Sequence, residues 1–166
     1  MNLSSTHLDE SFREAGELHL PSVDWRWIKA QAFQESRFDP KAVSPAGAQG
    51  IMQIMPATWV DLVKQGRAFG SPFDAEDSID AGVWYLSSLY NQWTAPRPAV
   101  DRLALAFASY NAGLGNILQA QRNAGGANSY NRIIKGLKAV TGPDNAHETT
   151  TYVERIFNYF TDLVLQ

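Results

Sequence analysis

The sequence predicts an all-α protein that folds as a compact helical domain. Along most of the 166 residues, apolar side chains recur at spacings of three and four, which is the period of a helix with one buried face. The sequence shows no strand-pairing signal and no internal repeat. Its length is sufficient for one hydrophobic core without metal ions or disulfides.

The predicted helices cover, in order, residues 24–38, 56–63, 77–90, 101–110, 116–122, 130–140 and 150–165. The first has Asp24 as its amino-terminal cap, and it ends before the turn-forming pair Asp39-Pro40. Turn-forming residues make residues 44–50 a loop. Pro56 fits the first turn of the second helix, where its missing N–H is not needed.

The later helices are expected to differ in burial. Residues 101–110 are apolar on nearly every side, which predicts a central buried helix. Gly113 and Gly115 end it. The prolines of residues 94–98 form a loop before this helix, and the glycines of residues 124–127 form a flexible link between the helices predicted at 116–122 and 130–140.

The composition excludes several classes of protein. Apolar residues make up 45% and charged residues 19% of the chain, as in an ordinary globular protein. The formal net charge of −3 argues against nucleic acid as a partner, because phosphate binding requires clustered Lys and Arg. The chain has no cysteine, and its three scattered histidines lack the spacing of zinc ligands. The sequence therefore predicts neither a metal site nor a cofactor.

Glu35 is the strongest candidate for a catalytic group. At helical spacing it shares one face with Ile28 and Ala32, so its carboxyl group continues a stripe that should be buried. A low-dielectric environment raises the pKa of a carboxyl group, which suits a general acid that protonates a leaving group, as in glycosidases. The alternative is a solvent-facing acid in the last turn of the helix.

Three blocks of sequence carry a family resemblance. They are residues 35–59 (ESRFDPKAVSPAGAQGIMQIMPATW), 108–113 (ASYNAG) and 148–153 (ETTTYV). In this order they resemble the soluble lytic transglycosylases, relatives of goose-type lysozyme that cleave the glycan strand of peptidoglycan. The family usually has Gly-Leu-Met-Gln and Ala-Tyr-Asn where this chain has Gly-Ile-Met-Gln and Ser-Tyr-Asn. The resemblance implies one lysozyme-like helical domain with a substrate cleft in residues 23–166, after a polar leader in residues 1–22.

The resemblance also implies a reaction. Glycosidases normally use two carboxylates, but only Glu35 is well placed here, because Asp39 before a proline is more typical of a turn. In the family, a single glutamate protonates the bond between MurNAc and GlcNAc while the N-acetyl group assists at the anomeric carbon. The same glutamate then accepts a proton from the 6-hydroxyl group. The product has a 1,6-anhydroMurNAc end, and no water is consumed.

Further site residues follow from their positions in the family's motifs. The resemblance implies substrate contacts by Ser44, Gln53, Met55, Tyr110, Asn111 and Tyr152, and by the backbone near Ser109. The hydroxyl group of Tyr152 is expected to meet the catalytic glutamate, and its ring to shield that glutamate from water. From the sequence alone, each of three residues has a structural alternative. Ser44 is equally well explained as a turn hydroxyl, Met55 is explained as a core residue, and Tyr152 as a residue that packs between helices. Glu148 is expected at a helix entry.

The leading functional hypothesis is a peptidoglycan lytic transglycosylase whose partner is the peptidoglycan glycan strand. Two alternatives stay open: a hydrolytic muramidase, in which water attacks, and a non-catalytic glycan-binding or virion structural module. The first ten residues lack the basic and apolar regions of a secretory signal, and no apolar run approaches the ~20 residues of a membrane span. A periplasmic or cell-wall-facing location therefore requires a targeting sequence outside this chain, or delivery within a larger cell-wall or phage assembly.

Overall fold

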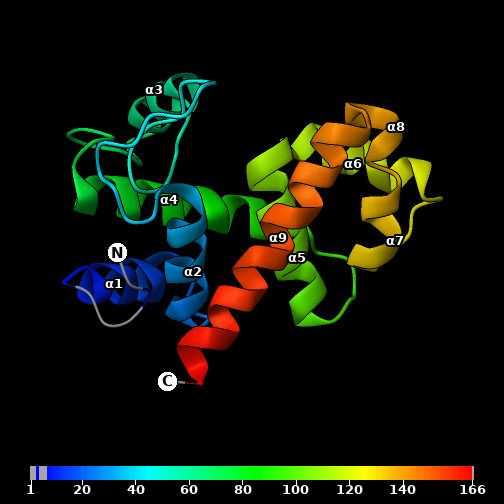
Figure 1. The fold of residues 1–166 in the computed structure, drawn as a ribbon, viewed down its shortest axis with the longest axis horizontal. Helices are drawn as coiled ribbons and strands as arrows, with labels where there is room; N and C mark the ends of the chain where they lie inside the picture. The colour runs from blue at the N-terminus through cyan, green and yellow to red at the C-terminus, as the bar shows by residue number, and fades with distance from the viewer. Residues whose placement is uncertain (1–2, 4–6, 166) are drawn as a thin grey trace. The chain divides into compact units, whose positions relative to one another are not determined.

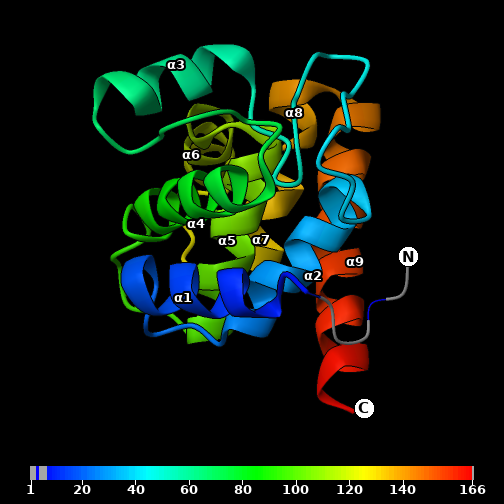
Figure 2. The ribbon, with the colours of Figure 1, turned by 90° about the vertical axis from the view of Figure 1, so that its left-hand side faces the viewer.

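The computed structural model describes residue 3 and residues 7–165, and its regular structure is helical (Figure 1, Figure 2). Within these residues, β-pairing is limited to two isolated bridges, Val43 with Gln49 and Gln49 with Ile54. The predicted all-α class is therefore confirmed. No helix in the described part of the chain has the length and apolar character needed to cross a membrane. The helices are α1 (Asp9–His19), α2 (Trp25–Ser36), α3 (Pro56–Lys64), α4 (Ala75–Tyr90), α5 (Ala99–Ala112), α6 (Leu114–Asn123), α7 (Tyr130–Lys135), α8 (Lys138–Thr141) and α9 (Pro143–Val164).

The backbone forms two compact units. The first unit contains the described residues up to Tyr85 together with those from Ile156 onward, and the second unit is Leu86–Arg155. The boundary between them falls within α4 and within α9. The division of the chain at residue 22 into a leader and a catalytic domain stays a prediction.

α1 lies in the segment that the sequence analysis treats as a polar leader, and no helix is predicted there. It packs beside α2 (Figure 2). Phe12 of α1 is fully buried, and its ring centroid lies 5.9 Å from that of Phe38. The buried ammonium group of Lys29, on α2, is 2.7 Å from the Oδ1 atom of Asp9. Because a buried charge without a partner is costly, this ion pair ties α1 to α2.

α2 begins at the predicted cap. The Oδ1 atom of Asp24 accepts a hydrogen bond from the backbone N–H of Arg26 at 2.9 Å. The hydrogen bond from the Arg26 side chain is the main cause that lowers the pKa of Asp24. On one face of α2, the ring of Trp27 stacks on that of Phe160 at a centroid distance of 3.7 Å. Within the first unit, the last turns of α9 therefore pack against α2.

The second unit is built around α5. Residues 103–109 of this helix are all buried, as the sequence predicts. α6 and α7 pack against α5, and α8 packs against α6 (Figure 1). The predicted helix over residues 130–140 is divided near Gly136 into α7 and α8. A Cβ atom on Gly136 would lie only 2.4 Å from the backbone oxygen of Ala120, so α6 leaves no space for a side chain there.

α9 begins earlier than predicted, at Pro143 instead of residue 150. Gly142, with a φ angle of 85°, follows the end of α8, and Pro143 fits the first turn of the next helix. Glu148 therefore lies in the second turn of α9. The expectation that Glu148 sits at a helix entry is wrong, because α9 begins at Pro143, five residues before Glu148.

Candidate active site

Glu35 lies in the last turn of α2 and is half-buried. Ala32 and Ile28, about one and two turns earlier on the same face, are completely buried. The carboxyl group therefore continues the apolar stripe to the edge of the core, as its spacing predicts. A carboxyl group in this position loses part of its hydration and is still accessible to a ligand.

The backbone just after Glu35 has an unusual conformation. Arg37 and Phe38 both have left-handed φ angles, 56° and 65°, which cost energy in residues other than glycine. Ser36 anchors this end of α2, because its hydroxyl group donates a hydrogen bond to the backbone oxygen of Ile51 at 2.8 Å. The side chain of Phe38 is only 2% exposed. Packing and hydrogen bonding together hold the turn that follows the acid.

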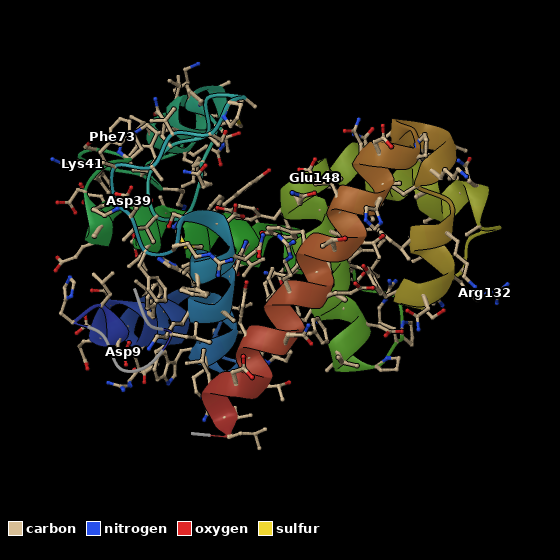
Figure 3. All side chains as sticks on the ribbon, viewed as in Figure 1. Asp9, Asp39, Lys41, Phe73, Arg132 and Glu148 are labelled. Atoms are coloured by element: carbon tan, nitrogen blue, oxygen red, sulfur yellow. The ribbon has the colours of Figure 1, made fainter. Side chains whose placement is uncertain are left out.

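Two polar residues form turns in the loop after α2. Asp39, labelled in Figure 3, accepts a hydrogen bond from the backbone N–H of Lys41 at 2.9 Å, which is the turn role predicted for it. Ser44 accepts a hydrogen bond from the backbone N–H of Ala48 at 3.0 Å. The Ser44 hydroxyl group therefore forms a turn and keeps one hydrogen to donate to a ligand.

Gln53 is bound to its own loop. It has a φ angle of 50°, and its Nε2 atom donates to the backbone oxygens of Gly50 and Ala42, at 2.9 and 3.2 Å. The side-chain oxygen is then the part of the amide that is left to accept a hydrogen bond from a ligand. Met55, at the start of α3, is 43% exposed. This exposure excludes the core-residue interpretation of Met55.

The loop before Gln53 lies against α4 without space for further atoms. A Cβ atom on Gly50, whose φ angle is 76°, would lie 1.8 Å from the backbone oxygen of Pro72. A Cβ atom on Gly82 of α4 would lie 2.6 Å from the Cβ atom of Met52. The loop is thus held by close approach as well as by hydrogen bonds.

Ser78 of α4 completes this contact, since its hydroxyl group accepts a hydrogen bond from the backbone N–H of Met52 at 3.3 Å. Neither Ser78 nor Gly82 is predicted from the sequence to support the site. A serine and a glycine inside a helix give no sign in the sequence of the distant loop that they contact.

In the second unit, the side chain of Ser109 belongs to the core. It is completely buried. The hydroxyl group accepts a hydrogen bond from the indole N–H of Trp93 at 3.1 Å and donates one to the backbone oxygen of Leu105 at 2.7 Å. The side chain therefore supports the core of the second unit, since its only hydrogen is donated within the protein. The expected substrate contact of the backbone near Ser109 stays a prediction.

The remaining predicted residues of the second unit lie on α5 and α9. Tyr110 and Asn111 are half-buried at the carboxyl end of α5, and Tyr152 on α9 is 5% exposed. The Oγ1 atom of Thr149 lies 2.8 Å from the Oδ1 atom of Asn111, which links the two helices. Sequence reasoning missed Thr149, although the residue belongs to the ETTTYV block.

A polar depression with a volume of about 200 Å³ lies beside Asn111 in the second unit. Apart from one alanine, its lining residues carry amide, hydroxyl or carboxylate groups: Asn111, Ala112, Asn116, Thr141, Asn145, Glu148 and Thr149. Glu148 is exposed on α9 (Figure 3). Side chains of these types bind sugar hydroxyl and amide groups. Across residues 3 and 7–165, no group of three or more His, Asp and Glu side chains is placed to hold a metal ion.

Residues 15–133 match the family described as the Transglycosylase SLT domain. The chain belongs to this family. A relative of the SLT domain, the membrane-bound lytic murein transglycosylase F of Yersinia enterocolitica, is 33% identical over 168 residues. That alignment covers 93% of this chain and 34% of the relative. The chain thus spans about one third of the length of this curated relative.

Two solved structures share the fold of this SLT domain. The 70 kDa soluble lytic transglycosylase of Escherichia coli has a TM-score of 0.72 and 29% identity, over 92% of this chain and 23% of that chain. An inactive mutant of the lytic transglycosylase Slt from Pseudomonas aeruginosa has a TM-score of 0.73 and 26% identity, over 95% and 24%. These comparisons confirm the predicted family and fold class.

The predicted site residues of the SLT domain fall into two sets, one in each unit. The first unit contains Glu35, Ser44, Gln53 and Met55, and the second contains Ser109, Tyr110, Asn111 and Tyr152. The family match ends at residue 133, so Tyr152 lies beyond it. The roles of these residues stay predictions, apart from the structural role now assigned to the Ser109 side chain.

Proposed function

We propose that this chain is a peptidoglycan lytic transglycosylase domain. It cleaves the β-1,4 bond between MurNAc and GlcNAc and leaves 1,6-anhydroMurNAc ends. Membership of the SLT family and the names of the relatives, which are lytic murein transglycosylases, support this activity. The observation that carries the proposal is the half-buried Glu35 at the end of a buried helical stripe, because that is where a carboxyl group can hold a proton for transfer.

Glu35 first acts as a general acid. It gives its proton to the glycosidic oxygen, the bond from the anomeric carbon to that oxygen breaks, and GlcNAc leaves with a free 4-hydroxyl group. The carbonyl oxygen of the MurNAc acetamido group attacks the anomeric carbon and forms an oxazolinium ion. The substrate thereby provides the nucleophile for which other glycosidases use a second carboxylate.

Glu35 then acts as a general base. Its carboxylate accepts the proton of the 6-hydroxyl group, and the 6-oxygen attacks the anomeric carbon as the bond to the acetamido oxygen breaks. This step forms the anhydro ring and returns Glu35 to its protonated state. Attack by a group already held on the same sugar is effectively unimolecular, which favours it over attack by water.

The other predicted residues are proposed to bind and orient the glycan. Ser44 donates its remaining hydrogen to the acetamido group, and the side-chain oxygen of Gln53 accepts a hydrogen bond from a sugar. Met55 offers an exposed apolar surface to a sugar ring. From the second unit, Tyr110, Asn111 and Tyr152 bind the strand.

The proposed partner is the glycan strand of peptidoglycan, and the proposed site of action faces the cell wall. The name of the Yersinia relative, a membrane-bound murein enzyme, supports this location. Delivery within a larger cell-wall or phage assembly is the finer form of the proposal. Detection of the chain in purified cell walls or in purified phage particles distinguishes the two routes.

Mass analysis of digested peptidoglycan tests the activity. We expect muropeptides with 1,6-anhydroMurNAc ends, each lighter by one water than the hydrolysed product and inert to borohydride. Glu35→Gln should keep the fold and lose nearly all cleavage. Products that borohydride reduces would show a hydrolytic muramidase. No soluble product from several wall types would indicate a non-catalytic glycan-binding or virion structural module.

A further inference from the structure

The contact between Asn111 and Thr149 lies at the edge of the polar depression in the second unit. Asn111, on α5, is half-buried, whereas Thr149, on α9, is only 2% exposed. Their side chains meet at 2.8 Å, and both residues line the depression. A buried hydroxyl group therefore touches an amide group that is accessible to a ligand.

The hydrogen of the Thr149 hydroxyl group decides how the Asn111 amide is oriented. Besides the Oδ1 atom of Asn111 at 2.8 Å, the backbone oxygen of Asn145 lies 3.1 Å from the hydroxyl oxygen. Both of these oxygens can only accept, and the hydroxyl group has one hydrogen. If Asn111 receives it, the Oδ1 atom is turned toward Thr149 and the NH₂ group is turned toward a ligand. If Asn145 receives it, the amide turns over to donate to Thr149, and its oxygen is left for a ligand.

Two observations favour the first arrangement. The contact with Asn111 is 0.3 Å shorter than the contact with Asn145, at 2.8 against 3.1 Å. The carboxylate of Glu148 lines the same depression, and a carboxylate is attracted to an NH₂ group and repelled by a carbonyl oxygen. Distance and charge therefore select the same orientation.

We propose that Thr149 is a positioning residue, which holds Asn111 so that the amide NH₂ group is presented to the ligand. The depression then binds a hydrogen-bond acceptor at Asn111, such as a sugar hydroxyl oxygen or the carbonyl oxygen of an acetamido group. That the ligand is a glycan rests on the proposed function. The orientation of the amide does not, because it depends only on contacts within the second unit.

Thr150 provides a matched control on the same helix. Its hydroxyl group donates to the backbone oxygen of Ala146 at 2.9 Å, and the Thr149 hydroxyl oxygen lies at a similar distance, 3.1 Å, from the backbone oxygen of Asn145 one residue earlier. Thr150 is half-buried and is not among the residues that line the depression. Thr150→Val therefore removes a comparable hydroxyl group without touching Asn111.

Kinetics with purified peptidoglycan provide the first test. Thr149→Val should raise KM about three- to tenfold and change kcat by less than twofold, as expected for the loss of one well-oriented hydrogen bond. Thr149→Ser should restore the KM, and Thr150→Val should not raise it. In an Asn111→Ala background, Thr149→Val should have little further effect, because the group it positions is gone. A lower melting temperature with an unchanged KM would overturn the proposal.

The side-chain amide signals of Asn111 in a ¹⁵N-¹H spectrum provide a test without turnover. The two NH₂ signals of Asn111 are identified as the pair that disappears from the spectrum of Asn111→Asp. We expect the pair to shift and broaden in Thr149→Val and to stay in place in Thr149→Ser and Thr150→Val. An unchanged pair in Thr149→Val would overturn the proposal even if the wild-type protein cleaves cell wall. If the wild-type protein does not cleave it, the proposed function fails, and the spectrum still decides the role of Thr149.

Thr149→Val places a methyl group where a buried hydroxyl group was. If this variant does not fold, it gives no information on the orientation of the Asn111 amide. Thr149→Ala then replaces it, because it removes the same hydroxyl group and adds no volume. The same pair of signals is measured. A shifted, broadened pair supports the proposal, and a pair identical to that of the wild-type protein overturns it.

Discussion

Apart from Glu35 on α2, the first unit holds its candidate site residues with irregular backbone, whereas the second unit presents them from regular helices. In the first unit, Gln53 has a left-handed backbone conformation and donates its amide hydrogens to backbone oxygens of its own loop. In the second unit, Tyr110 and Asn111 lie on α5 and Tyr152 on α9. There the distinctive contact joins two side chains, Thr149 and Asn111.

This difference predicts two kinds of sensitivity. The loop of the first unit depends on close approach to Pro72 and Gly82, so an added methyl group has no space to occupy. The helices of the second unit hold their backbone by themselves, so the side chains depend on the hydrogen bonds that orient them. The first unit should be damaged most by added atoms, and the second unit by removed hydroxyl groups.

Gly50→Ala should have the largest effect. The new Cβ atom would lie 1.8 Å from the backbone oxygen of Pro72, at a φ angle of 76° that already disfavours alanine. The left-handed conformation costs about 1–2 kcal/mol and overpacking about 1–3 kcal/mol, so the free energy of unfolding should fall by roughly 3 kcal/mol. Urea denaturation measures this loss.

Gly47→Ala is the matched control for Gly50→Ala. Gly47 lies in the same loop with a φ angle of 93°, but a Cβ atom there would meet nothing within 4 Å. Gly47→Ala should therefore lose only the free energy that the left-handed backbone conformation costs alanine, with no loss from overpacking. Equal losses in the two variants would mean that the contact with Pro72 does not hold the loop.

Gly82→Ala should have the next largest effect, a loss of about 1–3 kcal/mol in the free energy of unfolding from overpacking. The added Cβ atom would lie 2.6 Å from both the Cβ and the Cγ atoms of Met52. Gly115→Ala, on α6 of the second unit, meets no atom within 4 Å and should stabilise its helix by up to about 1 kcal/mol. A neutral Gly82→Ala would show that the loop can shift at no cost.

Ser109→Ala tests the second unit by removal. The indole N–H of Trp93, which is buried, would lose its acceptor, and an unsatisfied buried donor costs about 1–3 kcal/mol. In a Trp93→Phe background the same substitution should cost less, because the donor is absent. We expect a smaller effect on the KM for peptidoglycan than Asn111→Ala has. A larger effect would mean that the Ser109 side chain itself contacts the substrate.

The features that the sequence predicted well are those encoded locally. The cap of α2 at Asp24 and the burial of residues 103–109 follow from side chains close together in the chain. The family follows from three short blocks of residues, and the match over residues 15–133 confirms it. Local patterns of this kind identify an element or a motif whatever the rest of the chain does.

The features that the sequence missed depend on residues far apart in the chain. α1 is stabilised by Phe12 packing on Phe38, and a single aromatic residue in a charged segment does not stand out as an apolar stripe. The structural role of Ser109 depends on Trp93, which is 16 residues away. The function of such residues is set by a partner that only the folded chain brings near.

The smallest expected effect concerns the start of α2, at the opposite end of the helix from Glu35. There Asp24 and Arg26 form an ion pair that is partly exposed to solvent. The pKa of Asp24 is lowered in the folded protein, chiefly by its hydrogen bond with Arg26, so folding favours the charged carboxylate. Its stabilisation is therefore complete above the ordinary aspartate pKa of ~3.9 and is lost as the pH falls through the lowered value. The two side chains are 34% and 38% exposed, so the contribution should stay below about 1 kcal/mol.

Asp24→Asn isolates this charge, because asparagine is an equally good helix cap. Unfolding free energies of the wild-type protein and the variant, measured by urea denaturation from neutral pH to pH 2, should differ most at neutral pH and converge in acid. In an Arg26→Gln background the difference should nearly vanish at every pH. If the variant instead loses more stability at pH 2 than at pH 7, the ionised cap does not stabilise α2.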